Sequence, residues 1–382
     1  MREIFIIDAV RTAAGRRNGA LSQVHPVDLA AEVLAASVER SGVPADQVDD
    51  VVLGCVLQIG GQSANIARNA WLSAGLPEEV PAVTVDRQCG SSQQAITFAA
   101  QGVASGAFDL AIGAGVEVLS LITLNSAWEL GPSLGFRSPW DGKGWQERYG
   151  DVEIHQFRAG EDIARHWGIS RAEQDAFALE SHAKAIRATD EGRFAGQIHV
   201  VDGAAVDECI RRDMTAEKLA EIAPLREGGT VTGGSSSKLA DCAAAVMLAS
   251  ADAVERYHLT PIAKIHTSVA VGSDPVMMLT GPIPATAKVL DRAGLALKDI
   301  ELFECNEAFG AVVLAWARET GVDLAKVNVN GGAIALGHPL GATGARIMTT
   351  LVHELRRTGG RYGLQTICEG GGLANATVVE AL

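Results

Sequence analysis

Short runs of Val, Ile, Leu and Ala alternate with longer alanine-rich stretches along most of the 382 residues. Apolar runs of about four to eight residues are typical of buried strands, and alanine-rich stretches are typical of helices that cover them. This alternation predicts an α/β fold with a largely buried sheet. We expect strands at residues 1–10, 51–57, 82–85, 110–113, 262–265, 299–304, 326–329 and 362–368.

A weak internal repeat divides this pattern into two parts. Residues 106–115 resemble residues 360–370, because each copy has a glycine-containing turn after a helical stretch and an apolar strand that ends in glycine. Such a repeat predicts duplicated halves.

The amino-acid composition changes between the two halves. Residues 120–157 gather Gly, Pro and Ser with Trp128, Trp140 and Trp145, in a chain that is only 5% aromatic. This composition predicts an insertion or lid, in which the tryptophans either line a ligand groove or pack beneath a long loop. Ser170 with Glu173 three residues later predicts the start of a helix over residues 169–195.

Charge and cysteine usage exclude several classes of protein. The net charge of −14 repels phosphate polymers and anionic membrane surfaces, so we expect no nucleic-acid partner. No apolar run reaches the roughly 18 residues of a membrane span, and residues 1–10 read as a strand, not a signal sequence, so we expect a cytoplasmic protein. The six cysteines form no Cys-x-x-Cys pair, which predicts free thiols and no metal site.

Cys89 lies in a polar turn between the strand expected at 82–85 and a helical stretch. A helix N-terminus presents backbone N–H groups and the positive end of the helix dipole, which favour a thiolate. We therefore expect the pKa of Cys89 to lie below its ordinary value of about 8.5. Taken alone, a cysteine before a helix is more often structural than nucleophilic.

His338 lies in a loop, residues 330–344, that is rich in glycine. Pro339 restricts the preceding His338 to an extended conformation, which can aim its imidazole from a tight turn. His338 is thus a candidate general base, although a solvated turn histidine would have the same sequence. The loop lacks the Gly-Lys-Ser/Thr ending of a phosphate-binding P-loop.

Two more polar strings follow expected strands. Asn306-Glu307-Ala308-Phe309 follows the strand at 299–304, and Cys368 is followed by Glu369 and three glycines. Successive small residues can turn their N–H groups toward an oxyanion, and α/β folds place ligands at strand ends. The combination of two thiols, an imidazole and an amide predicts an active site.

In order and spacing, these four motifs resemble the four signatures of thiolases, the acetyl-CoA acyltransferases. The resemblance runs essentially from end to end. Ketosynthases of the same fold pair the first cysteine with two histidines, whereas this chain has a second thiol and Asn306. The resemblance implies an α/β thiolase fold of two duplicated αβαβα halves in a five-layered core. We place the N-terminal half at residues 1–119 plus 237–252, the lid at 120–236 and the C-terminal half at 253–382.

The resemblance also implies residue roles in a reversible thiolysis of 3-ketoacyl-CoA. Cys89 matches the acylated nucleophile, His338 the histidine that activates it, and Cys368 the residue that moves the α-carbon proton. Asn306 matches the residue that holds a water, which together with His338 binds the thioester oxygen. The N–H groups of Cys89 and Gly370 match a second oxyanion hole.

Substrate-binding positions follow from the same resemblance. Arg211 matches an arginine beside the adenine of coenzyme A, Ser237 a serine near the pantetheine, and His155 a histidine near the acyl end; Ala308 and Phe309 join this substrate-binding set. Coenzyme A and acetyl-CoA are then substrates, with no permanently bound cofactor. The resemblance further implies a homodimer or homotetramer.

Several residues depart from the usual thiolase pattern, which puts substrate size in doubt: Asp86, Gly90, Ser92, Gln156, Phe157 and Ser235. The sequence of residues 89–94 is similar to that of a subgroup of thiolases from bacterial fatty-acid and steroid-ring catabolism. The alternatives are a non-catalytic acyl-CoA or lipid-binding relative and a Cys/His hydrolase. The first has no need of two thiols beside an imidazole, and the second leaves Cys368 without a role.

Overall fold

The computed structural model describes residues 2–124 and 126–382, without the side chain of Trp128. The expectation for the tryptophans therefore lies partly outside the described residues. Among the residues described, no helix is both long and apolar enough to cross a membrane. All six cysteines are free thiols.

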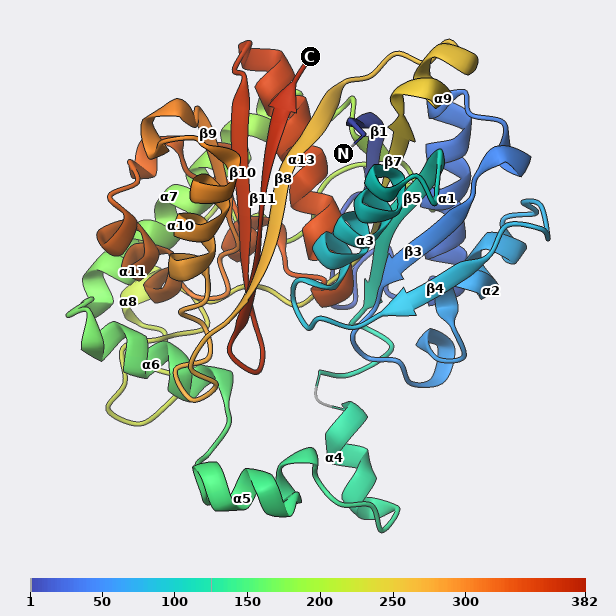
Figure 1. Cartoon of the computed structure of the whole chain (residues 1–382). Helices are drawn as coiled ribbons and strands as arrows, with labels where there is room; N and C mark the ends of the chain where they lie inside the picture. The colour runs from blue at the N-terminus through green and yellow to red at the C-terminus, as the bar shows by residue number, and fades with distance from the viewer. Residues whose placement is uncertain (1, 125) are drawn as a thin grey trace.

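The strands form one twisted sheet with two parts (Figure 1). Its order is β4-β3-β5-β7-β1-β8-β11-β10-β9. The two parts meet where β1 pairs with β8 through Phe5 and Ile6. The strands of the first part are β1 (Ile4–Thr12), β3 (Asp50–Gly54), β4 (Ala82–Val85), β5 (Leu110–Val118) and β7 (Ala240–Ser250); those of the second are β8 (Ala263–Gly272), β9 (Leu302–Cys305), β10 (Tyr362–Glu369) and β11 (Leu373–Ala381). Two short strands, β2 (Gly15–Arg16) and β6 (Ile198–His199), pair at the side with β7 and β1.

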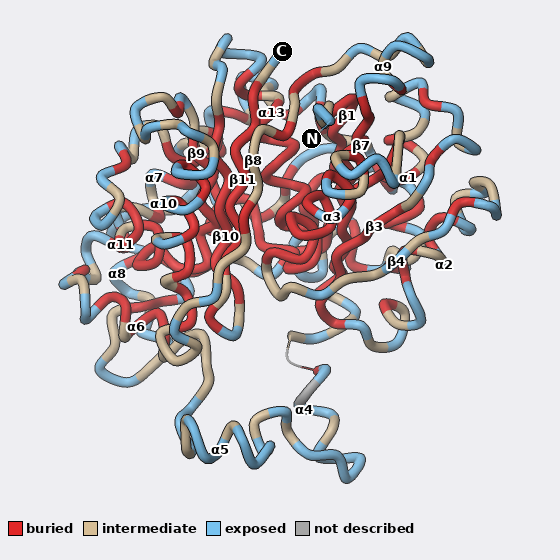
Figure 2. Tube along the Cα trace, in the orientation of Figure 1, coloured by how far each residue is buried: buried red, intermediate tan, exposed pale blue. Residues whose placement is uncertain are grey.

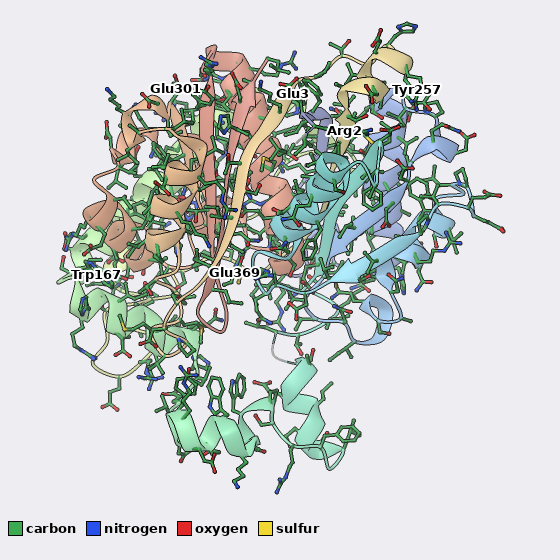
Figure 3. All side chains as sticks on the ribbon, viewed as in Figure 1. Arg2, Glu3, Trp167, Tyr257, Glu301 and Glu369 are labelled. Carbon is green, nitrogen blue, oxygen red and sulfur yellow. The ribbon has the colours of Figure 1, made fainter. Side chains whose placement is uncertain are left out.

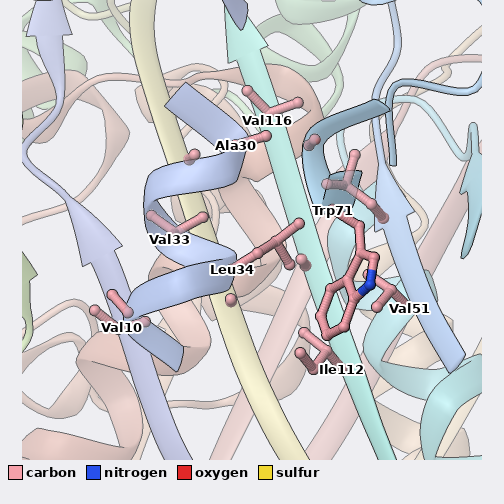
Figure 4. Packing of buried hydrophobic residues seen from close by; sticks show 14 of the residues in the cluster. Val10, Ala30, Val33, Leu34, Val51, Trp71, Ile112 and Val116 are labelled. Atoms are coloured by element: carbon pink, nitrogen blue, oxygen red, sulfur yellow. The ribbon is translucent and has the colours of Figure 1, made fainter. Parts of the chain in front are cut away.

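Helices fill the layers between and outside the two parts. Helices α3 (Ser91–Ser105) and α13 (Thr343–Thr358) pack on each other, and their apolar residues form one core with both parts of the sheet. Helices α1 (Pro26–Ser41) and α2 (Ile66–Ser73) cover the outer face of the first part, where Trp71 packs near Leu34 and Ile112 (Figure 4). Helices α10 (Pro282–Ala293) and α11 (Gly310–Thr320) cover the second part. The helices thus lie between and outside the two parts of the sheet, as expected for a layered α/β fold.

The internal repeat appears as the same unit in each part. Helices α3 and α13 both end at a glycine in the left-handed region, Gly106 with φ 81° and Gly359 with φ 72°. Each glycine leads into a buried strand, β5 or β10. The prediction of a strand at residues 326–329 is wrong, because Val327 makes only an isolated bridge to Phe303. Strands β7 and β11 were not expected, and both are buried almost throughout (Figure 2).

The segment between β5 and β7 contains most of the remaining helices. Helices α4 (Ser126–Ser133) and α5 (Lys143–Tyr149) stand away from the body (Figure 1), and Leu134 and Phe136 beside them are exposed. The assignment of residues 120–236 as a lid stays a prediction. Ser170 and Glu173 form the expected capping box at the start of α7. The same segment contains α6 (Gln156–His166), α7 (Arg171–Asp190) and α8 (Ala216–Ala220). Two short helices, α9 (Ala251–Arg256) and α12 (Ala333–Leu336), come after β7.

Candidate active site

The turn that carries Cys89 is held by short polar contacts. The Asp86 carboxylate accepts the N–H of Gln88 at 2.6 Å, and Ser91 Oγ accepts the N–H of Arg87 at 2.9 Å. Gln88 adopts a left-handed conformation with φ 49°. These contacts place Cys89 immediately before helix α3, as the sequence predicted, beside an apolar cluster formed by Val56, Leu57, Leu119 and Leu340.

The two expected thiols come together at this turn. Cys368, at the end of β10, lies close enough to Cys89 for its charge to raise the pKa of the Cys89 thiol. Burial is the largest cause of that rise, which takes the pKa well above its ordinary value, and Glu369 adds to it. The N–H groups of Cys89 itself and of Gly370 oppose the rise, because they point at the sulfur. The expected lowering of the Cys89 pKa is therefore wrong, since burial outweighs the helix terminus.

Cys368 is buried against the Asn306 string. Burial raises its pKa to about 12, and Glu369 adds to the rise, while the Asn306 side chain and the N–H of Ala308 act against it. Apart from this approach to the Cys368 sulfur, neither side-chain atom of Asn306 has a hydrogen-bond partner among the described residues, although the residue is only 2% exposed. A buried amide without partners is available to a water or a substrate oxygen.

Glu307 fixes the backbone that presents Asn306. Its carboxylate accepts hydrogen bonds from Ser181 Oγ at 2.7 Å, Asn328 Nδ2 at 2.9 Å and the N–H of Ile334 at 3.0 Å. A side chain at Gly332 would collide with this carboxylate. The Asn306 string is thus tied to the start of the His338 loop.

The proton position on His338 follows from its neighbours. His338 Nδ1 lies 2.7 Å from Thr343 Oγ1, and that hydroxyl donates its only proton to the carbonyl of Pro339 at 2.9 Å. The hydroxyl must therefore accept from Nδ1–H, which leaves Nε2 with a free lone pair. Burial lowers the pKa of His338 to about 3, and Nε2 has no partner among the described residues. A neutral imidazole with an unprotonated Nε2 can act as a base.

Glu117 joins the His338 loop to the wall beside Cys89, and the sequence analysis did not single it out. Its carboxylate accepts the N–H groups of Leu57 at 3.2 Å and Gly341 at 2.9 Å, and the side-chain amide of Gln62 at 2.6 Å. A single acidic residue inside the apolar strand β5 is the signal that could have found it.

The expected coenzyme positions lie at two places. Ser237 donates its N–H to the carbonyl of Ala308 at 3.0 Å, so it adjoins the Asn306 string. Arg211 lines a cavity of about 550 Å³ together with other cations, Arg16, Arg17, Arg212 and Lys238. The carbonyl of Lys238 accepts the N–H of His338 at 2.7 Å, so this basic cavity adjoins the His338 loop.

The remaining substrate-binding candidates form an apolar chain. His155 is the N-cap of helix α6 and packs against Phe157 with ring centroids 4.8 Å apart, and Phe157 packs against Phe309 with centroids 6.1 Å apart. Phe309 and Ala308 are buried in the cluster that contains Cys368. Phe157 therefore connects His155 to that cluster.

Comparisons with known proteins agree along the whole chain. The family model "Thiolase, N-terminal domain" matches residues 4–252, and "Thiolase, C-terminal domain" matches residues 259–381. A steroid 3-ketoacyl-CoA thiolase of Mycobacterium tuberculosis is 53% identical over 387 residues, covering 100% of this chain and 95% of that protein. A beta-ketoadipyl-CoA thiolase of Pseudomonas aeruginosa is 44% identical, covering 99% of each chain. The structure of human mitochondrial 3-ketoacyl-CoA thiolase in complex with CoA is similar with a TM-score of 0.90 and 36% identity, covering 100% of this chain and 98% of that one.

Proposed function

The chain belongs to the thiolase family, and on this premise we propose that it cleaves 3-ketoacyl-CoA with coenzyme A, reversibly, to acetyl-CoA and a shortened acyl-CoA. It is an acyltransferase whose substrates are coenzyme A and acyl-CoA esters. The observation that carries the proposal is the meeting of Cys89 and Cys368, from the two halves of the chain, at a point where the N–H groups of Cys89 and Gly370 converge.

In the first half-reaction, Cys89 Sγ attacks the 3-keto carbon while its proton passes to His338 Nε2. The N–H groups of Cys89 and Gly370 stabilise the negative oxygen of the tetrahedral intermediate. The bond between the α- and β-carbons then breaks, which leaves acyl-Cys89 and the enolate of acetyl-CoA. Cys368 gives its thiol proton to the α-carbon and becomes a thiolate.

His338 and Asn306 stabilise the negative oxygen of the enolate. Once Nε2 holds the proton from Cys89, it donates a hydrogen bond to that oxygen, and a water held by the unpartnered Asn306 amide donates another. In the second half-reaction, coenzyme A gives its thiol proton to the Cys368 thiolate and attacks the acyl carbon. The departing Cys89 sulfur takes its proton back from His338, so the enzyme is restored.

Coenzyme A is proposed to enter past the basic cavity at Arg211. The guanidinium and ammonium groups there can bind the phosphates of the coenzyme. The chain as a whole, with a net charge of −14, would repel these phosphates. Ser237 then lies toward the pantetheine, and His155, Ala308 and Phe309 lie toward the acyl end. The free thiols suit a reducing, cytoplasmic location.

We also propose a homodimer, or a tetramer built from dimers. Strand β4 is an edge strand, and its Val83 is 44% exposed; Phe98 of the next helix is 42% exposed. An unpaired apolar edge favours pairing with another chain. A second copy of the chain would protect it.

Bulky or ring-containing acyl groups are the proposed substrates, because the 53% identical relative is a steroid 3-ketoacyl-CoA thiolase. Thiolysis rates with short, long and polycyclic 3-ketoacyl-CoA esters would test this assignment. A higher kcat/KM for the polycyclic ester is expected, and a preference for acetoacetyl-CoA would contradict it.

The proposed reaction is tested by the covalent intermediate. Incubation with acetyl-CoA should add one acetyl group to Cys89 in intact-protein and peptide mass spectra, and Cys89→Ala should show no adduct. Cys368→Ala keeps the nucleophile and should still acetylate, but it should lose thiolysis by orders of magnitude, because it lacks the group that protonates the α-carbon and accepts the proton of coenzyme A. Binding without any adduct would favour a non-catalytic relative, and release of free acid without transfer would favour a hydrolase.

A further inference from the structure

Glu369 is a buried acid beside both thiols, and the mechanism above does not use it. It ends strand β10 directly after Cys368, so the two side chains point to opposite faces of the strand. Cys368 faces the apolar cluster with Ala308, whereas the Glu369 carboxyl faces Gly90. Glu369 is labelled in Figure 3. It is 0% exposed, and neither of its oxygens has a hydrogen-bond partner in the part of the chain described.

The carboxyl group is fitted against the turn that carries Cys89. A Cβ atom on Gly90 would collide with Glu369 Oε1 and lie 2.7 Å from its Cδ. Gly90 is one of the departures from the usual thiolase turn, and its missing side chain is what makes room for this acid. The two residues are therefore complementary in size.

The charges around Glu369 do not balance a buried anion. Arg87 and the backbone N–H of Asn375 favour the charged carboxylate, whereas Asp86 opposes it. Both thiols lie near enough for a Glu369 charge to oppose their ionisation. Burial raises the pKa of Glu369 well above its ordinary value, and Arg87 offsets this in part. Burial therefore favours the uncharged form of this acid.

We propose that Glu369 is a positioning residue whose uncharged carboxyl group packs on Gly90, fixes the Cys89 turn, and must remain uncharged for Cys89 to become a thiolate. The proposal rests on the proposed function only for its consequence in turnover. The proposal itself concerns the reactivity of the Cys89 thiol, which can be measured without turnover. A charged Glu369 would place a second negative charge beside the Cys89 sulfur and suppress its nucleophilic form.

The first experiment measures alkylation of Cys89 by iodoacetamide from pH 6 to pH 10, read by peptide mass spectrometry, which needs no turnover. In Glu369→Gln the carboxylate cannot form, so Cys89 should react about tenfold faster than in the native protein near the alkaline end. Glu304→Gln is the matched control. Glu304 is another buried glutamate, and burial raises its pKa to about 8. The charged groups that act on it are Arg346, Glu307, Glu354 and Lys184, so its charge is not set against Cys89 or Cys368. Coincident profiles for the native protein and Glu369→Gln would overturn the proposal.

The second experiment tests the fit between the two side chains. Gly90→Ala should slow Cys89 alkylation at neutral pH by about three- to tenfold, and Gly90→Ala combined with Glu369→Ala should react as fast as Glu369→Ala alone. Additive effects would contradict the positioning role. Thermal melts verify that each variant folds. If the native protein alkylates as expected but shows no thiolysis, the proposed function fails while this inference stands.

Discussion

At the scale of single residues, one hydroxyl group decides which nitrogen of His338 can act as a base. Thr343 donates to Pro339 and therefore accepts from His338 Nδ1–H. Thr343→Val removes this acceptor and leaves a buried N–H unpaired, at a cost of about 1–3 kcal/mol. We expect the rate of Cys89 acetylation to fall by about ten- to a hundredfold with little change in KM. Thr343→Ser keeps the hydroxyl and should retain most activity, and equal loss in both variants would contradict the assigned tautomer.

The same histidine makes stability depend on pH. Its pKa is about 3 in the folded protein and about 6.5 when unfolded, because burial disfavours the imidazolium. Below pH 6.5 the unfolded chain binds a proton that the folded chain does not, so stability is lost as pH falls toward 3. At pH 5 this loss is about 2 kcal/mol. Urea unfolding at pH 7 and pH 5 should show a smaller decrease for His338→Asn than for the native protein, and equal decreases would refute this origin.

At the scale of elements, Glu117 connects β5 to the His338 loop and to the residues after β3. Its carboxylate accepts hydrogen bonds from three backbone N–H groups, the Gln62 amide and the Cys55 thiol. Glu117→Gln replaces one acceptor by a donor, which must face one of these donors and leave it unpaired. We expect a loss of about 1–3 kcal/mol in the free energy of unfolding, together with slower acetylation of Cys89. Unchanged denaturant midpoints would show that this tie is dispensable.

Elements with strong local signals could be predicted from the sequence. The capping box at Ser170 and the glycine that ends each repeated helix depend on near neighbours in the chain, and the structure has both. Strand β7 was missed because an alanine-rich run reads equally as a buried helix or a buried strand. Residues 326–329 were apolar enough for a strand, but Asn328 binds Cys305 through its side chain there, so the pairing stops at one bridge.

The site could be predicted only where a motif names the residue. Cys89, His338 and Cys368 stand in recognisable strings, whereas Glu117 and the fit of Glu369 on Gly90 arise between segments more than two hundred residues apart. The direction of the Cys89 pKa was wrong for the same reason. The helix terminus is visible in the sequence, but the burial and the neighbouring acid that outweigh it come from tertiary packing.

At the scale of the whole molecule, the two halves share one central layer. Helices α3 and α13 pack between both parts of the sheet, so separated halves would each expose an apolar face. We therefore expect a single cooperative unfolding transition by circular dichroism and intrinsic fluorescence, with coincident midpoints. Two resolved transitions would show that the halves are independent. The division of the chain at residues 119, 237 and 253 stays a prediction.

The free edge at β4 is the surface at which we expect copies of the chain to associate. Because Val83 is 44% exposed on an edge strand, a lysine there should blunt pairing with a second copy by placing a charge in the contact. Light scattering coupled to size exclusion should give about twice the chain mass of 39.8 kDa, or a multiple of it, for the native protein. Val83→Lys should shift that mass toward the monomer. Val206→Lys is the matched control, since Val206 is 52% exposed and lies in a loop outside this edge. A native protein that runs as a monomer, or a Val83→Lys variant that keeps its native mass, would place the contact elsewhere.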